Sequence, residues 1–432
     1  MSRAADTIFA LSSGAPPAAI AIIRVSGPAV TDALLAMAGR LPEPRRATLM
    51  RVCDPRDDSV LDQAIILYFP GPDTVTGEDL AELHVHGGRA VVHAVLATLS
   101  TIKGLRAAQA GEFTRRAFDN GRIDLNAADG LADLLSAETE WQRRAATRMF
   151  SGQFGDQIEI WRTELLRLSA LTEAELDFSD EDDVGEQNSR LISDGCTALQ
   201  REITAILNAP SAEKLRDGLR IVFGGPPNSG KSSLFNALIG RDAAIISDIA
   251  GTTRDVIEAP VSLGGIPLLL IDTAGVRDDS ADVIEQIGID RALKAFDGAD
   301  IVLWLGPEEG GPAHDNLIEI AAMADRADRI HKSAAALAVS VQSGLGIVEL
   351  KQAIMVRAER LLPPQDSFAV NSRQRGWLSE AAEHLSAASV ANDWLIVGEE
   401  LRHTRLALDA LTGRTHTEDL LDTIFGKFCV GK

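Results

Sequence analysis

The chain has 432 residues, of which 45% are hydrophobic and 24% charged, and its formal net charge is −21. This length predicts two to four domains, and the composition excludes a largely disordered chain. The negative charge argues against nucleic-acid binding through bulk electrostatics. Two basic pairs, Arg115–Arg116 and Arg143–Arg144, are interpreted as solvated helix faces.

The N-terminal segment carries apolar runs, but Asp6, Pro16, Pro17 and Arg24 interrupt any signal-peptide core. The sequence has no apolar stretch long enough to cross a bilayer. We therefore expect a cytoplasmic protein. The cysteines are odd in number and widely spaced, which argues against a disulfide framework: Cys53, Cys196 and Cys429.

Residues 1–118 have the pattern of a mixed α/β domain. Segments 19–27 and 64–70 are rich in β-forming residues and bounded by turn residues, which predicts two strands. Segment 90–102 is apolar and free of helix breakers, and it predicts a helix.

Two helical regions, 119–217 and 361–432, flank a third region at 218–360, where strands alternate with helices as in a mainly parallel sheet. Apolar residues in the first helical region recur at spacings of three and four: Ile158, Trp161, Leu165, Leu168 and Leu171. Because each helix must bury its apolar stripe, we expect both flanks to pack together as one helical domain, with the α/β region inserted into it.

Residues 219–238, LRIVFGGPPNSGKSSLFNAL, contain the phosphate-binding pattern G-x-x-x-x-G-K-[ST] between a strand and a helix. Backbone N–H groups and the helix N-terminus attract phosphate. Lys231 would reach the outer phosphates, and the Ser232 hydroxyl would bind Mg²⁺. The candidate nucleotide-binding residues here are Asn228, Ser229, Gly230, Lys231, Ser232 and Ser233.

Two further segments, SDIAGTTRD (247–255) and DTAG (272–275), complete the pattern of a switch-type nucleotide hydrolase. Asp272 ends an apolar strand, where such domains hold Mg²⁺ through water, and Thr252 or Thr253 could supply a second hydroxyl. The candidate nucleotide-binding residues here are Ser247, Asp248, Ile249, Ala250, Gly251, Thr252, Thr253, Asp272, Thr273, Ala274 and Gly275.

The catalytic machinery has a gap after DTAG. Related enzymes place a Gln there to orient the attacking water, but this chain has Val276. Downstream, Asp282 and Glu285 are carboxylates that could orient water or accept its proton through a relay.

Several segments together resemble the MnmE (TrmE) family of tRNA-modification GTPases. They are AAIISDIAGTTRDV, the Asn of PPNSGKSS, IEQIGIDRA, the blocks at 69–88 and 111–129, and the ending FCVGK. The resemblance covers nearly the whole chain. It implies a folate-binding N-terminal domain that drives dimerisation, and a helical domain that carries the inserted GTPase domain.

The resemblance also implies the activity. With an FAD-containing partner, MnmG (GidA), such proteins install an aminomethyl-type group on the wobble uridine of tRNA, using a tetrahydrofolate derivative. K⁺ would stabilise the switch regions during GTP hydrolysis. Given the net charge of −21, we expect tRNA to bind mainly through the complex with the partner.

Roles implied for individual residues follow the family's motifs. Glu285 matches the catalytic Glu, and Ser232 and Thr253 match the Mg²⁺ ligands. The K⁺ ligands implied are Asn228, Ser247, Ile249 and Thr252, and the folate contacts implied are Arg24, Glu82, Arg122 and Lys432. Arg122 stands where the family leads us to expect Lys. Cys429 near a one-carbon donor suggests a nucleophile, while a packed structural thiol is the alternative.

Guanine recognition usually rests on Asn-Lys-x-Asp, whose Asp accepts two hydrogen bonds from the base. We place this motif at His331–Ala334, just before Ser340, where Lys332 is kept but Ala334 cannot accept a hydrogen bond. This placement predicts weakened GTP binding, poorer discrimination against adenine and partial rescue by Ala334→Asp. The alternative is that a nearby acid, Asp325 or Asp328, takes over.

Two other functions remain compatible with the motifs. The chain could be a GTPase switch that acts as an assembly factor, or a variant with impaired guanine specificity that retains its binding surfaces. The folate-like N-terminal region and the FCVGK ending favour the modification enzyme, because an assembly factor needs neither.

Overall fold

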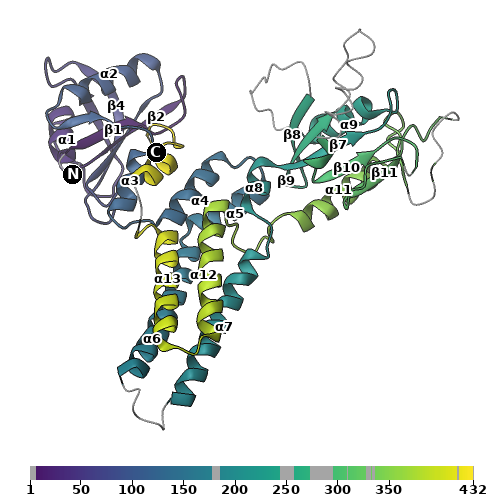
Figure 1. Cartoon of the computed structure of the whole chain (residues 1–432). Helices are drawn as coiled ribbons and strands as arrows, with labels where there is room; N and C mark the ends of the chain where they lie inside the picture. The colour runs from purple at the N-terminus through teal and green to yellow at the C-terminus, as the bar shows by residue number, and fades with distance from the viewer. Residues whose placement is uncertain are drawn as a thin grey trace. The chain divides into compact units, whose positions relative to one another are not determined.

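The computed structural model describes residues 6–177, 185–243, 257–272, 295–308, 310–326, 332, 336–415 and 418–431. The chain forms two compact units (Figure 1). Unit 1 comprises residues 1–132 and 412–432, and unit 2 comprises residues 133–411.

Unit 1 is built on a six-stranded sheet in the order β3-β4-β5-β2-β1-β6. Its strands are β1 (Thr7–Leu11), β2 (Ile20–Ser26), β3 (Thr48–Cys53), β4 (Val60–Phe69), β5 (Leu80–His86) and β6 (Leu105–Ala107). Its helices are α1 (Val30–Ala38), α2 (Arg89–Thr101), α3 (Glu112–Asp119), α14 (Glu418–Phe425) and the first part of α4 (Leu125–Ser136). The strands predicted at 19–27 and 64–70 and the helix predicted at 90–102 are confirmed by β2, β4 and α2.

The main core of unit 1 lies on one face of this sheet, under α1 and α2. Alternate residues of β2 and β5 point into it, among them Ile23, Val25 and Leu83. Because side chains alternate along a strand, Arg24 and Glu82 lie on the opposite face.

The C-terminal segment of the chain packs against β1 and the start of α3, within unit 1. Val430 forms a β-bridge with Ala110, and the Ser12 hydroxyl donates to the Gly431 carbonyl at 2.9 Å. A Cβ at Gly111, whose φ is +68°, would lie 2.1 Å from the Phe425 carbonyl oxygen, so only glycine fits this contact.

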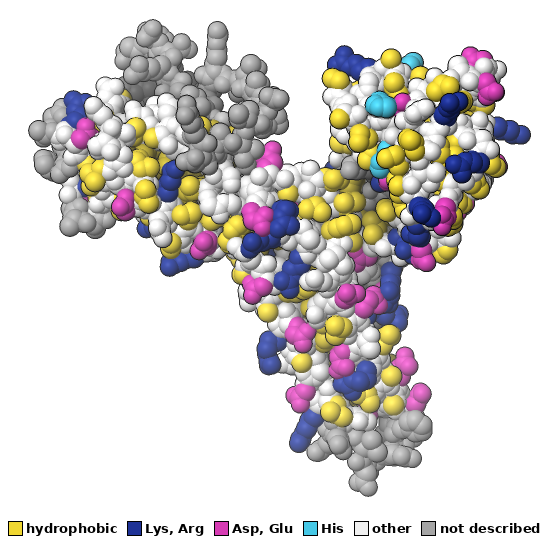
Figure 2. Space-filling model, turned by 180° about the vertical axis from the view of Figure 1, so that it is seen from behind, with side chains coloured by type: hydrophobic (Ala, Val, Ile, Leu, Met, Phe, Trp, Pro, Cys, Tyr) yellow, Lys and Arg dark blue, Asp and Glu magenta, His cyan; other side chains and the backbone are white. Residues whose placement is uncertain are grey.

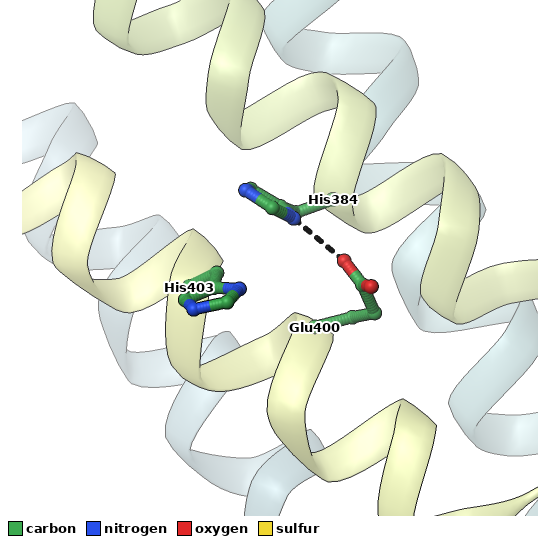
Figure 3. Close-up of side chains that lie close together, drawn as sticks. All are labelled: His384, Glu400 and His403. Atoms are coloured by element: carbon green, nitrogen blue, oxygen red, sulfur yellow. Dashed lines mark hydrogen bonds and ion pairs between the residues drawn. The ribbon is translucent and has the colours of Figure 1, made fainter.

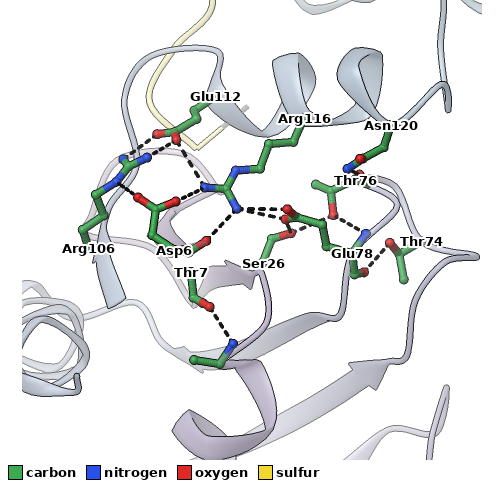
Figure 4. A network of polar contacts seen from close by, with 11 residues as sticks. Asp6, Thr7, Ser26, Thr74, Thr76, Glu78, Arg106, Glu112, Arg116 and Asn120 are labelled. Atoms are coloured by element: carbon green, nitrogen blue, oxygen red, sulfur yellow. Dashed lines mark hydrogen bonds and ion pairs between the residues drawn. The ribbon is translucent and has the colours of Figure 1, made fainter. Parts of the chain in front are cut away.

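Arg116 is the centre of a buried polar network in unit 1 (Figure 4). Its guanidinium is paired with Asp6 at 2.9 Å, Glu78 at 3.0 Å and Glu112 at 3.4 Å. Burial alone would raise the pKa of Glu112, but hydrogen bonds from Arg106 and the Gln109 amide hold that pKa below its usual value. Arg116 is only 8% exposed, so for this residue the expected solvated helix face is wrong.

Replacing Arg116 with Ala is expected to destabilise unit 1 by about 1–3 kcal/mol, because it leaves the largely buried Glu78 carboxylate without its cation, while Arg106 still pairs with Asp6 and Glu112. Chemical denaturation would measure the loss, with the exposed Arg143→Ala as a matched control near zero. Since the pKa values of Asp6 and Glu112 are depressed, the network's stabilisation is complete at neutral pH and is lost as pH falls through those values. An Arg116→Ala protein as stable as the parent would contradict this account.

Unit 2 contains the helical bundle and the inserted α/β region. The helices before the insertion are α5 (Glu140–Phe150), α6 (Gln153–Asp177), α7 (Gly185–Leu207) and α8 (Ala212–Asp217), and those after it are α12 (Ser372–Val390) and α13 (Trp394–Thr412). One core joins α6 and α7 with α12 and α13, which confirms that both flanks pack together. The predicted α6 stripe is buried from Ile158 to Leu168, and Leu171 is partly buried.

The inserted region holds a second six-stranded sheet in the order β12-β11-β10-β7-β9-β8. The described elements are β7 (Leu219–Gly224), α9 (Lys231–Ala243), β8 (Ile257–Leu263), β9 (Ile266–Asp272), β10 (Ile301–Trp304), β11 (Leu317–Ala321), β12 (Leu337–Ala338) and α11 (Ile347–Leu361), whose buried face joins the core of this sheet. All strand pairs are parallel except β8 with β9, as the sequence predicted for a mainly parallel sheet. The carboxyl ends of β7, β9, β10 and β11 therefore meet at one edge, where ligands bind in open α/β sheets.

Within the described ranges, no helix combines the length and the apolar character that crossing a bilayer requires.

Candidate functional site

The phosphate loop lies between β7 and α9, as predicted. Three of its residues have positive φ: Gly225 at +142°, Asn228 at +61° and Gly230 at +98°. A Cβ at Gly225 would lie 2.9 Å from the Gly306 amide nitrogen and 3.0 Å from the Ser229 hydroxyl, so the first glycine permits a close backbone approach. These conformations turn the loop over the N-terminus of α9, a geometry suited to an anion.

Lys231, the first residue of α9, is folded back into the loop. It is 6% exposed, and its ammonium donates to the carbonyl oxygens of Gly225 at 2.8 Å and Pro226 at 2.9 Å. Burial lowers its pKa, and the charge of Asp272 opposes that shift. A positive charge held inside the loop by neutral carbonyls is suited to phosphate oxygens, which bind an ammonium more strongly.

Ser232 and Asp272 come together from different elements, the start of α9 and the end of β9. The Ser232 hydroxyl donates to the Asp272 carboxylate at 2.8 Å, and Asp272 is 1% exposed. A hydroxyl and a carboxylate are oxygen ligands of the kind that Mg²⁺ prefers. The buried Ser229 hydroxyl has no hydrogen-bond partner in the described part of the chain, so this loop keeps polar capacity for a ligand.

Several predicted residues lie outside the described ranges: Ser247, Asp248, Ile249, Ala250, Gly251, Thr252, Thr253, Thr273, Ala274, Gly275, Val276, Asp282, Glu285, His331, Ala334 and Lys432. Their roles stay predictions.

The segment that directly follows β11 is Ala322–Asp325, of which sequence reasoning named only Asp325, as an alternative acid for reading the base. A Cβ at Gly230 would lie 3.4 Å from the Met323 Cε and 3.8 Å from the Ala322 Cβ, so this segment touches the phosphate loop. Met323 has a φ of +54°, which turns the chain sharply at the end of the strand.

Asp325 ends this turn beside Ser340. The Ala324 amide donates to the Val339 carbonyl at 3.1 Å, which fixes the turn against the segment after β12. A hydrogen bond with the Ser340 hydroxyl holds the pKa of the exposed Asp325 below its usual value. The structure thus puts an ionised carboxylate at the carboxyl edge of the sheet, in the same segment whose Ala322 and Met323 touch the phosphate loop.

Lys332, the lysine of the predicted guanine motif, contacts residues of strands β10 and β11. Its ammonium donates to the Trp304 carbonyl at 2.9 Å and forms an ion pair with Glu319 of β11. β11 is followed directly by Ala322–Asp325, whereas His331–Ala334 comes later in the chain and lies outside the described residues except for Lys332. The predicted contact of Lys332 with the base stays a prediction.

The predicted folate residues of unit 1 partly converge. Arg24 and Glu82 are partners on adjacent strands, with an ion pair of 2.8 Å between Arg24 Nη2 and Glu82 Oε1. Arg122 lies 3.5 Å from Asp73, and Cys429 is an exposed thiol in the C-terminal segment. Folate binding by these groups stays a prediction.

Comparisons with known proteins identify the family. The model of the MnmE helical domain matches residues 125–429, and that of the GTP-binding protein TrmE N-terminus matches residues 7–122. A tRNA modification GTPase MnmE from Novosphingobium aromaticivorans is 53% identical over 99% of this chain and 100% of its own length. The chain belongs to the MnmE family of tRNA modification GTPases. The relative from Erythrobacter litoralis, with the same name, is 54% identical over 99% of the chain and 100% of its own length. As a member of this family, the chain is a GTP-hydrolysing enzyme.

Among solved structures, the G domain of the Thermotoga maritima FeoB iron transporter is 26% identical over 32% of this chain and 98% of its own. Its TM-score is 0.25. The account of the nucleotide site therefore rests on the sheet order and the loop geometry of this chain.

Proposed function

We propose that this protein couples GTP hydrolysis to modification of the wobble uridine of tRNA, together with a flavoprotein partner and a folate one-carbon donor. The observation that carries the proposal is the phosphate loop with Lys231 and the Ser232–Asp272 pair, in a chain whose N-terminal unit matches the TrmE N-terminus.

Magnesium would be held by the Ser232 hydroxyl, by Asp272 through water and by Thr253, and it would neutralise charge on the β- and γ-phosphates. Lys231 would bind the outer phosphates with the ammonium that the loop carbonyls now hold. Glu285 would orient the attacking water in place of the missing Gln.

Base selection is proposed to rest on Asp325. Its carboxylate would accept hydrogen bonds from N1–H and the 2-amino group of guanine, which adenine does not offer, while the Ser340 hydroxyl orients it. Ala322 and Met323 contact Gly230 and would supply the link between the base side and the phosphate side of the site.

Transfer RNA is proposed to bind through the complex with the partner. Acidic and basic side chains are interleaved over the helical part of unit 2 on the face that Figure 2 shows. Neighbouring ion pairs on these helices, such as Arg167–Glu164 and Arg402–Glu399, cancel each other's charge. Together with the net charge of −21, this surface offers little bulk attraction for phosphate.

Mass analysis of tRNA nucleosides from a deletion strain tests the proposed function. The wobble-uridine modification should disappear on deletion, return with the wild-type chain and fail to return with Lys231→Ala. Unchanged tRNA in the deletion strain would favour the assembly-factor alternative.

Hydrolysis is expected to be much faster in K⁺ than in Na⁺. Asn228, held at positive φ in the loop, would contribute its side-chain oxygen to a K⁺ ion that supplies positive charge at the transition state. Steady-state hydrolysis in the two salts would measure the difference, and Asn228→Ala should abolish it. Equal rates in K⁺ and Na⁺ for the parent protein would refute the K⁺ requirement.

A further inference from the structure

A cluster of His384, Glu400 and His403 lies on the helical bundle of unit 2, outside the nucleotide site (Figure 3). His384 comes from α12, and Glu400 and His403 come from α13 at a spacing of three residues, which places them on one face of that helix. The three side chains offer ligand atoms that all lie within 4.8 Å of one another.

The sequence explains why these groups meet half-buried at the edge of the helix interface. Each adjoins a residue with no exposed surface in the interior of the bundle: Leu385, Leu401 and Thr404. The side chains of His384 and Glu400 are 26% and 23% exposed. A ligand would therefore reach the cluster from solvent, while the packed residues beside it hold the helices in place.

We propose that this cluster is a binding site for a divalent transition-metal ion, Zn²⁺ in the first instance. Two imidazoles and one carboxylate form a ligand set that zinc uses with water in the fourth position. Magnesium, the ion of the nucleotide site, prefers oxygen ligands and would not compete.

The geometry requires only small side-chain rotations. Tetrahedral zinc with bonds of about 2.0–2.1 Å places its ligand atoms about 3.3 Å apart. His384 Nδ1 and Glu400 Oε2 are 2.6 Å apart and joined by a hydrogen bond, so they must separate slightly as the metal replaces the shared proton. The ring centroids of His384 and His403 are 4.9 Å apart, close to the roughly 5.2 Å expected for two imidazoles on one tetrahedral zinc, so the rings need to rotate rather than approach each other.

The charges around the cluster favour a cation when the imidazoles are neutral. Glu400 and Glu399 carry two negative charges, and Arg402 neutralises one of them through its pair with Glu399 at 2.7 Å. Arg402 Nη2 also lies 2.9 Å from His403 Nε2 and donates to it. That nitrogen therefore carries a lone pair that can coordinate a metal. For this, the Arg402 guanidinium must leave His403 Nε2 and keep only its ion pair with Glu399.

Zinc titration of the chelator-treated full-length protein, in competition with a chromophoric chelator, tests the proposal. We expect one Zn²⁺ per chain at this site. Glu400→Gln and His403→Ala should each weaken it at least about tenfold, because losing even an outer partner of a metal ligand typically costs that much. The control, His86→Ala, removes an exposed histidine of unit 1 and should leave the affinity unchanged.

Cobalt absorption provides a second measurement that does not depend on the stability of the variants. Co²⁺ bound by nitrogen and oxygen gives visible bands without the intense charge-transfer band of a thiolate. Bands without thiolate character that Zn²⁺ abolishes support the site. A thiolate band would assign the metal to cysteine instead, and equal zinc affinity in Glu400→Gln, His403→Ala and the parent would overturn the proposal.

Discussion

Replacing Asp325 with Ala is expected to lower the affinity for GTP by at least about 100-fold, since two charge-assisted hydrogen bonds contribute roughly 1.5–3 kcal/mol each. ATP, which makes neither bond, should bind almost as well as before. Competition of labelled GTP by unlabelled GTP and ATP would measure both effects.

Asp325→Asn provides a sharper version of the same test. The amide would still accept from N1–H of a purine, but its NH₂ group would face the 2-amino group of guanine, donor against donor. Xanthine has an oxygen at that position. The variant should therefore bind XTP better than GTP, an inversion that mere loss of folding cannot produce.

Two further variants separate this assignment from its alternatives. If the base were read by Asp328, Asp328→Ala would show the loss and Asp325→Ala would not. If His331–Ala334 stood at the base, Ala334→Asp would strengthen GTP binding. We expect both variants to bind GTP as the parent does, and a strong gain in Ala334→Asp would contradict the role given to Asp325.

Replacing Glu285 with Ala is expected to lower the turnover number by about 100-fold or more while leaving GTP affinity nearly unchanged. A group that orients or deprotonates the attacking water contributes to the transition state and little to the ground state. Single-turnover hydrolysis and nucleotide titration would separate the two effects.

Lys231→Ala is the contrasting variant for Glu285→Ala. Its ammonium lies inside the phosphate loop and would contact phosphate in the bound ground state, so its removal should weaken binding itself. If Glu285→Ala hydrolyses GTP at the parent rate, another residue orients the water, and Asp282→Ala becomes the next test.

The phosphate loop could be predicted because every signal for it is local. A short apolar strand, closely spaced glycines and a helix start follow one another within one segment. The joint helical core was also predictable, because apolar stripes on both flanks require burial, and Ile158, Trp161 and Leu165 are indeed buried.

The sequence directed attention away from Ala322–Asp325, the turn to which we assign base binding as a proposal, because β11 is a weak strand signal. Residues 317–321 are few and include Glu319, whose charge is paired with Lys332 in the structure. With so weak a strand signal, Lys332 is the sequence feature in this region that most resembles the guanine motif. The structure draws attention to Asp325 through its hydrogen bond with Ser340, and sequence spacing does not reveal that contact.

The network around Arg116 and the cluster of His384, Glu400 and His403 were not predicted, for a related reason. The sequence predicts that Arg116 is exposed to solvent, because its partners Asp6 and Glu78 are distant in sequence. The Glu400–His403 spacing is visible along one helix, but the choice of His384 as the third member depends on how α12 packs beside α13. Long-range pairing of this kind follows from packing, which the sequence pattern constrains only loosely.

The contact of the C-terminal segment with β1 has a consequence for biosynthesis. Residues 412–431 complete unit 1, yet the ribosome makes them after all of unit 2. The β1–β6 sheet can form early in translation. It then lacks its contacts with Val430 and Gly431 until residues 133–411 have been synthesised. A nascent chain that stalls within unit 2 therefore leaves the C-terminal end of β1 and the start of α3 uncovered, where proteases and chaperones can reach them.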